Sequence, residues 1–507
     1  MNVVISGGGP NGLMLACELA LAGQRPVVLE RLPEPSVEPK ANGLVGEVVR
    51  LVDHRGLYEA LAARPGPPQP NSGFFPYAGM YLNLGLLDRS PLHVLPVPQR
   101  KIVNVLTERA LALGVEIRAG HELVGLSQDD DGVTVRVDGP DGRYELRTQY
   151  LVGADGARSA VRKLCGIDFP GVTYDRTTLR MAHAIVPPDW IDPATRGLKI
   201  PGHGIALPFI GIRTEQGNFS YAPLPDHPPT IATTEWDQPE SDEPLTMDEM
   251  RASVRRVLGV DLPLGEPTGD GPHLLNRLAK GNTRIAERFR DGRVFLLGDA
   301  AHIYSAGGGG LNLGMQDAAN LGWKLAAAIA GTAPDGLLDT YDRERRIAAE
   351  RLVVHASATA AMVAPGSDVT ALRTLFGEML ADPSAVKRVA ELMAGTDIRY
   401  DMGIADAHPL VGRFAPPMDL VTPDGPVRLA ELARTARPLL LDFTGTLGRF
   451  QGPVDVITAE PVDGLPAAML IRPDTYVAWA SDEPSAEGLA DTLERWFGSR
   501  TVAVNQL

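Results

Sequence analysis

Three glycines and one acidic residue near the start of the chain have the types and spacing of a dinucleotide-binding turn. The apolar residues 3–6 run directly into Gly7-x-Gly9-x-x-Gly12, and a helical pattern follows. Gly7 permits a tight turn, Gly9 lets the backbone approach a pyrophosphate, and Gly12 lets the helix pack closely on the strand. The helix N-terminus supplies N–H groups and a positive partial charge for phosphates. Glu30, at the end of the next apolar strand, can accept hydrogen bonds from an adenosine ribose, which favours FAD or NAD over NADP.

A second turn, far along the chain, indicates that the dinucleotide is FAD. The apolar residues 294–297 lead into Gly298 and Asp299, and the glycine-rich residues 307–310 then open a long helical pattern. In an open α/β sheet, ligands bind at the edge where strands end, so Asp299 can hold a ribityl or ribose hydroxyl. The N-terminus of the following helix can stabilise the negative charge of a reduced flavin near its N1 and C2 oxygen. A third acidic and glycine-containing turn, Asp155-Gly156, follows the apolar residues 150–153.

Each of these motifs also has a purely structural interpretation. The first can be a tight turn without a ligand, the second a glycine-rich surface loop, and the third a capped turn. The order of strand, turn and helix around them favours nucleotide binding. No nucleophile–base triad, metal-ligand cluster or paired-carboxylate motif stands out, so no catalytic side chain is assigned. Tyr221 and Trp236 can line an aromatic substrate pocket, although core packing is an equal interpretation of each.

The turns require a parallel sheet to bring them together. Residues 2–6, a helix over 11–22 and a strand over 26–30 predict a right-handed βαβ unit. A helical pattern spans 103–113, and alternating valines at 133–137 between turn signals predict a β-meander. Long helices are expected over 313–330 and 336–361.

Two further regions differ in composition. Residues 175–270 are rich in proline with short aromatic stretches, which predicts an inserted mixed sheet with long loops. Residues 401–423 are rich in proline and glycine and predict a linker, followed by a small α/β domain with a final helix near 485–496.

The totals limit the function classes. A chain of 507 residues is too long for one core, so two to four domains are expected. The net charge of −15 argues against nucleic acid or an anionic membrane as the main partner. Two cysteines imply no disulfide framework and favour a reducing compartment. The sequence shows neither a secretion signal nor an apolar run near 18 residues, so we expect a cytoplasmic protein.

Taken together, the motifs give the chain a family resemblance. It resembles the group A flavoprotein aromatic hydroxylases, the family of para-hydroxybenzoate hydroxylase and phenol hydroxylase, and most resembles the actinobacterial branch that acts on aromatic polyketides. The resemblance covers nearly the whole chain. The matching stretches are residues 7–12 with 30–31, 40–44, 97–99, 155–162, 298–302 and 316–325.

The resemblance implies an architecture and a set of cofactor contacts. The fold would be α/β with α+β inserts: a discontinuous Rossmann-like FAD-binding domain over 1–175 and 271–400, a substrate-binding sheet over 176–270 with part of 70–100, and a thioredoxin-like domain without cysteines over 408–507. Glu30 and Arg31 would hold the adenosine end, and Gln99 would reach the flavin or its ribityl chain. Asp155 would lie near the pyrophosphate and the nicotinamide approach path. The cofactor-binding residues predicted from motifs and resemblance are Gly7, Gly9, Pro10, Asn11, Gly12, Glu30, Arg31, Lys40, Gln99, Asp155, Gly156, Asp299, Gly309, Gly310, Leu311 and Asn312.

The chain departs from the family pattern in two places. Ser305-Ala306 stand where the family has one or two prolines, and the loop to Leu311-Asn312 is one residue shorter. Lys40 replaces the usual arginine, so a point charge replaces a planar fork that can contact flavin or NAD(P)H.

The sequence therefore predicts an FAD-dependent NAD(P)H:O2 monooxygenase that hydroxylates an aromatic, polyketide-type substrate through a C4a-hydroperoxyflavin. NAD(P)H would bind transiently, since only one Rossmann signature is present. One alternative is Baeyer–Villiger oxygenation of a polyketide ketone on the same scaffold. Others are a flavin reductase or oxidase and a flavin-binding protein without catalysis. No metal is expected. A homodimer formed through the C-terminal domain is one expectation, and coverage of the FAD domain by that domain is the other.

Overall fold

The computed structural model describes residues 2–36, 41–223, 228–269, 271, 273–305, 308–447 and 454–498. Its centre is a six-stranded sheet, here called the central sheet, with strand order β19-β20-β11-β1-β2-β7. Five strands run parallel and only β19 is antiparallel. The strands are β1 (Val3–Ser6), β2 (Val27–Glu30), β7 (Glu116–Ala119), β11 (Tyr150–Gly153), β19 (Arg290–Asp291) and β20 (Val294–Leu296). The three predicted turns follow β1, β11 and β20, so parallel neighbours bring them to one edge.

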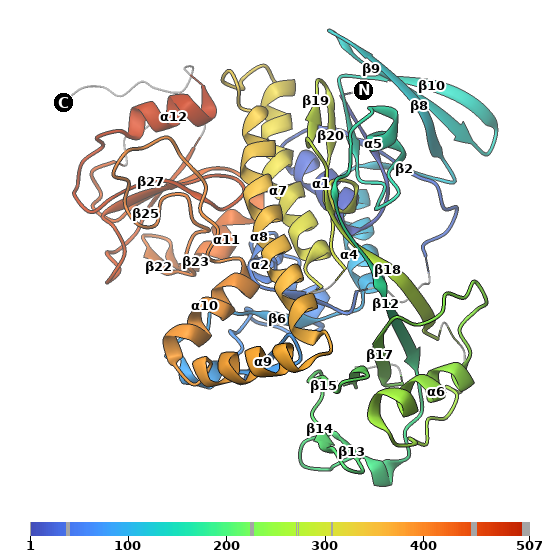
Figure 1. Cartoon of the computed structure of the whole chain (residues 1–507). Helices are drawn as coiled ribbons and strands as arrows, with labels where there is room; N and C mark the ends of the chain where they lie inside the picture. Colours follow the sequence, from blue (N-terminus) through green and yellow to red (C-terminus); the bar gives the residue numbers. More distant parts are fainter. Residues whose placement is uncertain are drawn as a thin grey trace.

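Helices cover the central sheet, and glycines let two of them pack closely. Helix α1 (Pro10–Leu21) packs along α7 (Gly310–Ile329), and α8 (Asp339–Val363) lies beside α7 at the centre of the molecule (Figure 1). A Cβ added at Gly314 of α7 would lie 2.2 Å from Asn11 Nδ2 of α1, and one at Gly322 would lie 2.5 Å from Glu18 Cβ. Glycine therefore sets the α1–α7 distance. The other helices of this region are α2 (Glu47–His54), α3 (Tyr58–Ala62), α4 (Gln99–Ala112), α5 (Ala160–Leu164), α9 (Ser367–Met379) and α10 (Pro383–Ala394).

A second six-stranded sheet, here called the inserted sheet, has the order β15-β16-β17-β12-β18-β21. Its strands β12 (Gly171–His183) and β18 (Leu275–Ile285) are long antiparallel neighbours that connect it to the central sheet (Figure 1). Helix α6 (Met247–Leu258) covers one face. The remaining strands are β15 (Ile212–Arg213), β16 (Gly217–Ala222), β17 (Thr230–Trp236) and β21 (His302–Ile303), with the ribbon β13 (Leu198–Ile200) and β14 (Gly204–Ala206) beside them. This sheet extends beyond 176–270 at both ends.

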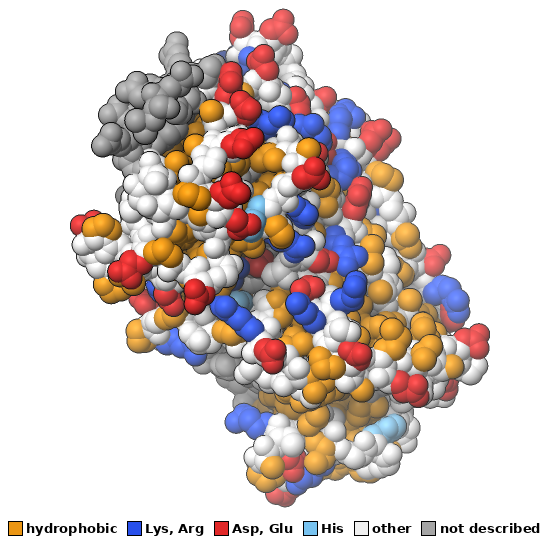
Figure 2. All heavy atoms as spheres, turned by 90° about the vertical axis from the view of Figure 1, so that its left-hand side faces the viewer, with side chains coloured by type: hydrophobic (Ala, Val, Ile, Leu, Met, Phe, Trp, Pro, Cys, Tyr) orange, Lys and Arg blue, Asp and Glu red, His pale blue; other side chains and the backbone are white. Residues whose placement is uncertain are grey.

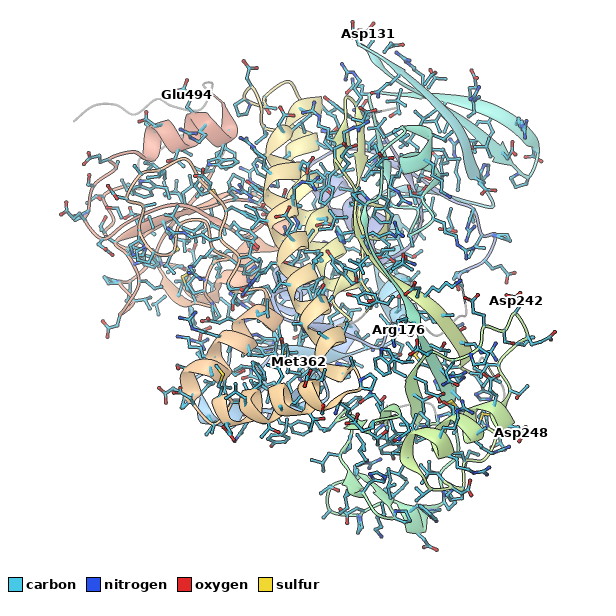
Figure 3. The ribbon with its side chains drawn as sticks, in the orientation of Figure 1. Asp131, Arg176, Asp242, Asp248, Met362 and Glu494 are labelled. Atoms are coloured by element: carbon cyan, nitrogen blue, oxygen red, sulfur yellow. The ribbon has the colours of Figure 1, made fainter. Side chains whose placement is uncertain are left out.

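Smaller strand pairs complete this part of the chain. The predicted meander is an antiparallel sheet of β8 (Glu122–Asp129), β9 (Gly132–Gly139) and β10 (Gly142–Thr148). In Figure 3, Asp131 at its tip and Asp248 on α6 lie at opposite ends of the molecule. Two ribbons pair β3 (Gly43–Val45) with β6 (Val94–Pro96) and β4 (Phe74–Tyr77) with β5 (Met80–Asn83).

The far end of the inserted sheet is tied to the helices by a set of contacts that we call the Arg213 clasp. Arg213 donates to the carbonyl oxygens of Ala364 (2.7 Å) and Gly366 (2.9 Å) and to Thr370 Oγ1 (2.8 Å). The backbone N–H of Gly366 in turn donates to Glu215 Oε2 at 3.0 Å. The clasp thus joins the β15–β16 turn to the junction between α8 and α9.

The C-terminal part forms the small α/β, thioredoxin-like domain that was predicted. Its four-stranded mixed sheet has the order β25-β24-β26-β27. The elements are β22 (Asp419–Thr422), β23 (Gly425–Arg428), α11 (Leu429–Leu432), β24 (Leu439–Asp442), β25 (Asp455–Thr458), β26 (Ala468–Ile471), β27 (Val477–Ser481) and α12 (Leu489–Phe497). Its residues join the central sheet in one hydrophobic cluster, whereas the inserted sheet has a cluster of its own.

Buried charges fix this domain to the rest of the chain. Arg472, which is 1% exposed, donates to both oxygens of Glu344 of α8 (2.7 and 2.8 Å) and to Asp474. Asn320 and Lys324 of α7 donate to the same Glu344 at 2.6 and 2.7 Å. Burial lowers the pKa of Lys324 to about 8, against the opposing effect of Glu344. The domain therefore covers α7 and α8, which agrees with the expectation that it covers the FAD domain.

The outer surface on this side is mixed in charge. Figure 2 shows acidic and basic side chains interspersed over the face that the C-terminal domain and the central helices present. Within the described ranges, no single helix has the length and apolar composition needed to cross a membrane, and one bent pair, α8 with α9, passes that test jointly.

Two buried histidines make the free energy of unfolding depend on pH. Burial, and then Arg50, lower the pKa of His93 to about 4, and burial lowers that of His54 well below its ordinary value. The unfolded chain binds these protons near pH 6.5 whereas the folded chain does not, so stability is complete above that pH and is lost as the pH falls toward 4. Each histidine contributes up to about 1.4 kcal/mol per pH unit.

In urea denaturation between pH 7 and 5, His93→Gln should reduce the dependence of unfolding free energy on pH by about one proton. An unchanged slope would contradict the assignment.

Candidate active site

The first glycine turn encloses open space. Gly7 has φ +114°, and a Cβ there would lie 2.3 Å from the carbonyl oxygen of Ala154, so only glycine fits without strain. A Cβ at Gly12 would lie 2.0 Å from the carbonyl oxygen of Gly7, which agrees with close strand–helix packing. At Gly9, by contrast, a Cβ would meet no atom within 4 Å. The backbone at the N-terminus of α1 is thus accessible, as binding of a pyrophosphate requires.

Glu30 is held in place by the same turn. Its Oε2 accepts a hydrogen bond from the N–H of Gly8 at 2.7 Å, and its Oε1 accepts one from that of Leu32 at 2.9 Å. Each oxygen keeps a second lone pair, so the carboxylate can still accept from ribose hydroxyls. Arg31 is exposed beside it. Lys40 lies outside the described residues.

The second turn meets the first at the sheet edge. Gly298 has φ +58°, and a Cβ there would lie 2.2 Å from Asn11 Nδ2. Asp299 is exposed at this edge, and a Cβ at Gly310 would lie 3.5 Å from its Oδ1. The carboxylate therefore stands next to the start of α7.

The remaining predicted residues surround these two turns. Asp155 Oδ2 accepts hydrogen bonds from the N–H groups of Ala160 (2.7 Å) and Val161 (3.1 Å). A Cβ at Gly156 would meet nothing within 4 Å. Gln99 contacts Ala41 through its backbone N–H (2.8 Å) and its side-chain oxygen (3.4 Å).

Two buried oxygens at this edge have no hydrogen-bond partner among the described residues. They are Asp155 Oδ1 and Asn11 Oδ1. A buried acceptor without a donor is unfavourable by about 1–3 kcal/mol, so such atoms indicate a site for donors that the chain does not supply. Hydroxyl-bearing and N–H-bearing parts of a dinucleotide are donors of this kind.

A buried ion pair behind the edge was not predicted. Asp317 of α7 accepts from the N–H of Gly298 (3.0 Å), from His302 Nε2 (2.8 Å) and from Arg345 Nε of α8 (2.6 Å). Arg345 also donates to the carbonyl oxygen of Leu313 at 3.1 Å. Burial alone would raise the pKa of Asp317, but Arg345 and His302 hold it at about 2. One pair thus fixes both the Gly298 turn and the first turn of α7.

A pattern in the sequence of α7 indicates that buried polar partners are present. Asp317, Asn320 and Lys324 are polar residues at helical spacing on a mostly apolar helix, so they share one face of α7. All three are at most 1% exposed. Polar residues on a buried helix face indicate partners from another element.

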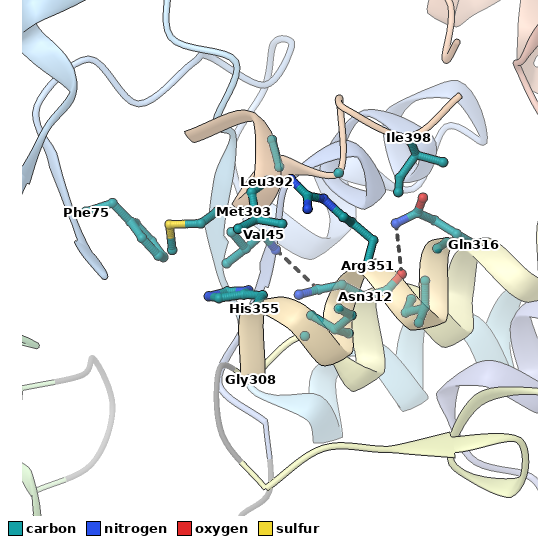
Figure 4. A pocket seen from close by; sticks show the side chains of 16 residues that line it. Val45, Phe75, Gly308, Asn312, Gln316, Arg351, His355, Leu392, Met393 and Ile398 are labelled. Carbon is teal, nitrogen blue, oxygen red and sulfur yellow. Dashed lines mark hydrogen bonds between the residues drawn. The ribbon is translucent and has the colours of Figure 1, made fainter. Parts of the chain in front are cut away.

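A pocket of about 100 Å³ lies at the start of α7 (Figure 4). Gly308, Gly309 and Asn312 form one side, and side chains of α8 and α10 form the other. Asn312 Oδ1 accepts from the N–H of Val45 at 3.2 Å, which ties α7 to β3. The pocket therefore opens beside the segment predicted to contact the flavin.

The inserted sheet separates the two predicted substrate residues. Tyr221 is 1% exposed and packs with Phe219 and Ile231 in the cluster beneath α6. Trp236 is half-buried and belongs to the alternate set of β17 side chains, on the face opposite α6. The open face is thus the one available to a ligand, and Tyr221 is not on it.

Comparisons with known proteins agree with this geometry. Residues 1–356 match the family described as "FAD binding domain", and residues 408–499 match "Aromatic-ring hydroxylase, C-terminal". The chain is 42% identical to the 12-dehydrotetracycline 5-monooxygenase/anhydrotetracycline 6-monooxygenase of Streptomyces rimosus, over 98% of this chain and 99% of that one.

Solved structures show the same architecture. One is the OxyS anhydrotetracycline hydroxylase from Streptomyces rimosus, with 40% identity, a TM-score of 0.84, and coverage of 98% of this chain and 99% of that one. Another is the Diels-Alderase PyrE3 of pyrroindomycin biosynthesis, with 33% identity, a TM-score of 0.82 and the same coverage. One scaffold therefore carries activities of two classes.

Proposed function

Since the chain belongs to the FAD-dependent aromatic-ring monooxygenases, we propose that it hydroxylates an aromatic substrate of the polyketide type, with NAD(P)H as electron donor. The observation that carries the proposal is the meeting of three turns at one sheet edge, where Gly9 and Gly156 leave open space and two buried oxygens lack donors. FAD, when bound there, supplies electron transfer from NAD(P)H to O2 and delivery of one oxygen atom.

The protein's own residues would hold the cofactor along this edge. Glu30 and Arg31 bind the adenosine ribose, and the N-terminus of α1 faces the pyrophosphate. Asp299 accepts from the ribityl hydroxyls, and the N-terminus of α7 places N–H groups toward the pyrimidine side of the flavin. The complete set in this proposal is the sixteen residues predicted from the sequence, Lys40 included, with Asn11 and Asp155 supplying the acceptors that lack donors.

The substrate would lie between the start of α7 and the open face of the inserted sheet. Adjacent strands put Ser220, Ala232 and Met181 side by side on that face, with Trp236 farther along β17. Small, polar and apolar side chains alternate there, which suits a flat oxygenated ring system. Enclosure between helix and sheet excludes water from the reacting atoms.

Three finer points complete the proposal. The FAD-binding domain spans 1–175 and 271–400 and the C-terminal domain spans 408–507, as expected from the sequence. The substrate domain, expected over 176–270 with part of 70–100, also takes in the start of β12 from Gly171 and all of β18 to Ile285. The protein functions in the cytoplasm, where NAD(P)H is supplied, and forms a homodimer. Sedimentation of the purified protein tests the last point.

The deciding experiment is rapid-mixing absorbance with product mass analysis. The FAD-loaded protein is mixed with NADPH or NADH, with and without anhydrotetracycline or related aromatic polyketides, and then with O2. Faster flavin reduction with substrate and a product heavier by one oxygen atom are expected. A ring-expanded ester of the same mass would instead indicate Baeyer–Villiger oxygenation. A product of unchanged mass would favour the second activity class that the scaffold carries, that of the Diels-Alderase.

Glu30 offers a direct test of the cofactor orientation. Glu30→Gln keeps the shape but removes the charge that accepts from ribose hydroxyls, so FAD affinity should fall about tenfold, or about 1.4 kcal/mol. Calorimetric titration of the apoprotein with FAD measures it. Glu108→Gln, on the exposed side of α4, is the matched control and should leave affinity unchanged. Equal affinity in both variants would contradict the orientation.

A further inference from the structure

The pocket at the start of α7 is apolar apart from a few side chains (Figure 4). Its walls include Phe75 of β4, Leu352 of α8 and Met393 of α10. Gly308 and Gly309 close it on the side of the flavin-facing turn. A planar ring edge suits such walls, and any polar group that lines the pocket then determines which substituent is accepted.

Three of the four polar side chains in the pocket already have partners. Asn312 accepts from Val45 N, and Gln316 Nε2 donates to the carbonyl oxygen of Asn312 at 3.2 Å. Arg351 Nε pairs with Asp397 at 2.6 Å. These groups shape the wall and are less available to a ligand.

His355 is the exception. It is 6% exposed, and neither ring nitrogen has a hydrogen-bond partner in the part of the chain that the structure describes. Its ring stacks on Tyr77, with centroids 5.5 Å apart and an interplanar angle of 14°, so its orientation is fixed by packing. Since His355 lines the pocket, its ring nitrogens are available to a hydrogen-bonding group that enters there.

The charge state of His355 follows from its surroundings. Burial, and then Arg351, lower its pKa below the ordinary value, so the ring is neutral at neutral pH. Arg351 with its partner Asp397, and Tyr77, are the titratable groups placed around it among the described residues. A neutral imidazole has one nitrogen that accepts a hydrogen bond.

We propose that this pocket receives the hydroxyl-bearing ring edge of a phenolic substrate, and that His355 accepts the hydrogen bond from that hydroxyl. This inference rests on the proposed function. As the O–H bond lengthens toward the imidazole nitrogen, the oxygen lone pair is released into the ring, and the ortho and para carbons become better nucleophiles toward an electrophilic oxygen. Arg351 disfavours a full imidazolium, so His355 polarises the O–H bond, and the proton stays with the hydroxyl of the product.

The test uses two variants of the FAD-loaded protein with anhydrotetracycline as the probe. His355→Leu removes the acceptor, and kcat should fall about 10–100-fold, at the lower end of general-base effects. His355→Gln keeps an acceptor that does not titrate, so it should recover part of kcat. Because burial and then Arg351 lower the pKa of His355, wild-type kcat should decline only at a pH below the ordinary imidazole value of about 6.5, where the ring becomes protonated and stops accepting. His355→Gln should lack this decline. His408→Gln, in the C-terminal domain, is the control and should behave as wild type.

Binding spectra separate this inference from the proposed function. Binding to the wild-type protein should shift the phenol absorbance of the probe toward that of the phenolate. His355→Leu should abolish this shift, and circular dichroism should show that the variant remains folded. If wild type oxygenates the probe while both variants keep kcat and the spectral shift, the inference is wrong and the proposed function stands. If wild type forms no oxygenated product but shows a shift that His355→Leu abolishes, the proposed function fails and the pocket assignment stands.

Discussion

Replacing Asp317 by asparagine should destabilise the apoprotein by about 3–5 kcal/mol and strongly weaken FAD binding. The carboxylate is fully buried, and its removal leaves Arg345 of α8, itself 1% exposed, without its counter-charge. Breaking one side of a buried pair has an effect of that size because the remaining charge stays desolvated. Urea denaturation of the apoprotein measures the stability loss.

The effect on FAD follows from what Asp317 connects. It accepts from the N–H of Gly298, and its partner Arg345 donates to the carbonyl oxygen of Leu313, so both segments that we propose to face the flavin depend on one pair. Asp299→Asn is the matched control, because it changes the same turn at an exposed position. It should weaken FAD binding while leaving apoprotein stability nearly unchanged. Loss of stability in both variants, or in neither, would contradict this division of roles.

Replacing Arg472 by methionine should loosen the C-terminal domain. Arg472 bridges Glu344 of α8 and Asp474, and its guanidinium also lies 4.4 Å from the ring centroid of Trp496. Without it, the two buried carboxylates keep Lys324 and Asn320 as their side-chain donors among the described residues, and an effect of about 3 kcal/mol is expected. Thermal unfolding and limited proteolysis across residues 395–418 measure the loosening.

An exposed pair on the meander is the control for that variant. Arg143→Gln breaks the ion pair with Asp138, where the arginine side chain is 81% exposed, and it should leave the unfolding temperature unchanged. A protein truncated after residue 408 should aggregate, because the apolar surface of α7 and α8 that the C-terminal domain covers would be exposed to water. If that truncated protein stays folded and retains FAD, the interface is not essential to the central sheet.

Local patterns predicted the elements that carry the motifs. Each turn combines an apolar run with a glycine at a strained or crowded position, so the strands at residues 3, 150 and 294 were predicted to within one or two residues. Helix α4 begins at Gln99, four residues before the predicted start, because Pro98 can occupy the N-cap while the polar Gln99-Arg100-Lys101 hides the helical period. Helices α9 and α10 were not assigned.

Pairings over long separations could not be predicted in the same way. Asp317 and Arg345 are 28 residues apart and meet only because α7 and α8 pack side by side. Alternation along β16 and β17 separates Tyr221 from Trp236, but only the position of α6 shows which face is buried. His355 gave no signal, because its environment comes from β4, α7 and α10 together.

The Arg213 clasp changes the mechanics of the inserted sheet. Strands β12 and β18, with 13 and 11 residues, carry the sheet away from the central sheet like a beam fixed at one end. The clasp fixes the other end to the junction of α8 and α9. A beam fixed at both ends bends far less than a cantilever under the same thermal force. The proposed substrate space between sheet and helices should therefore keep a nearly constant width, so that an incoming ring system must match that width instead of setting it.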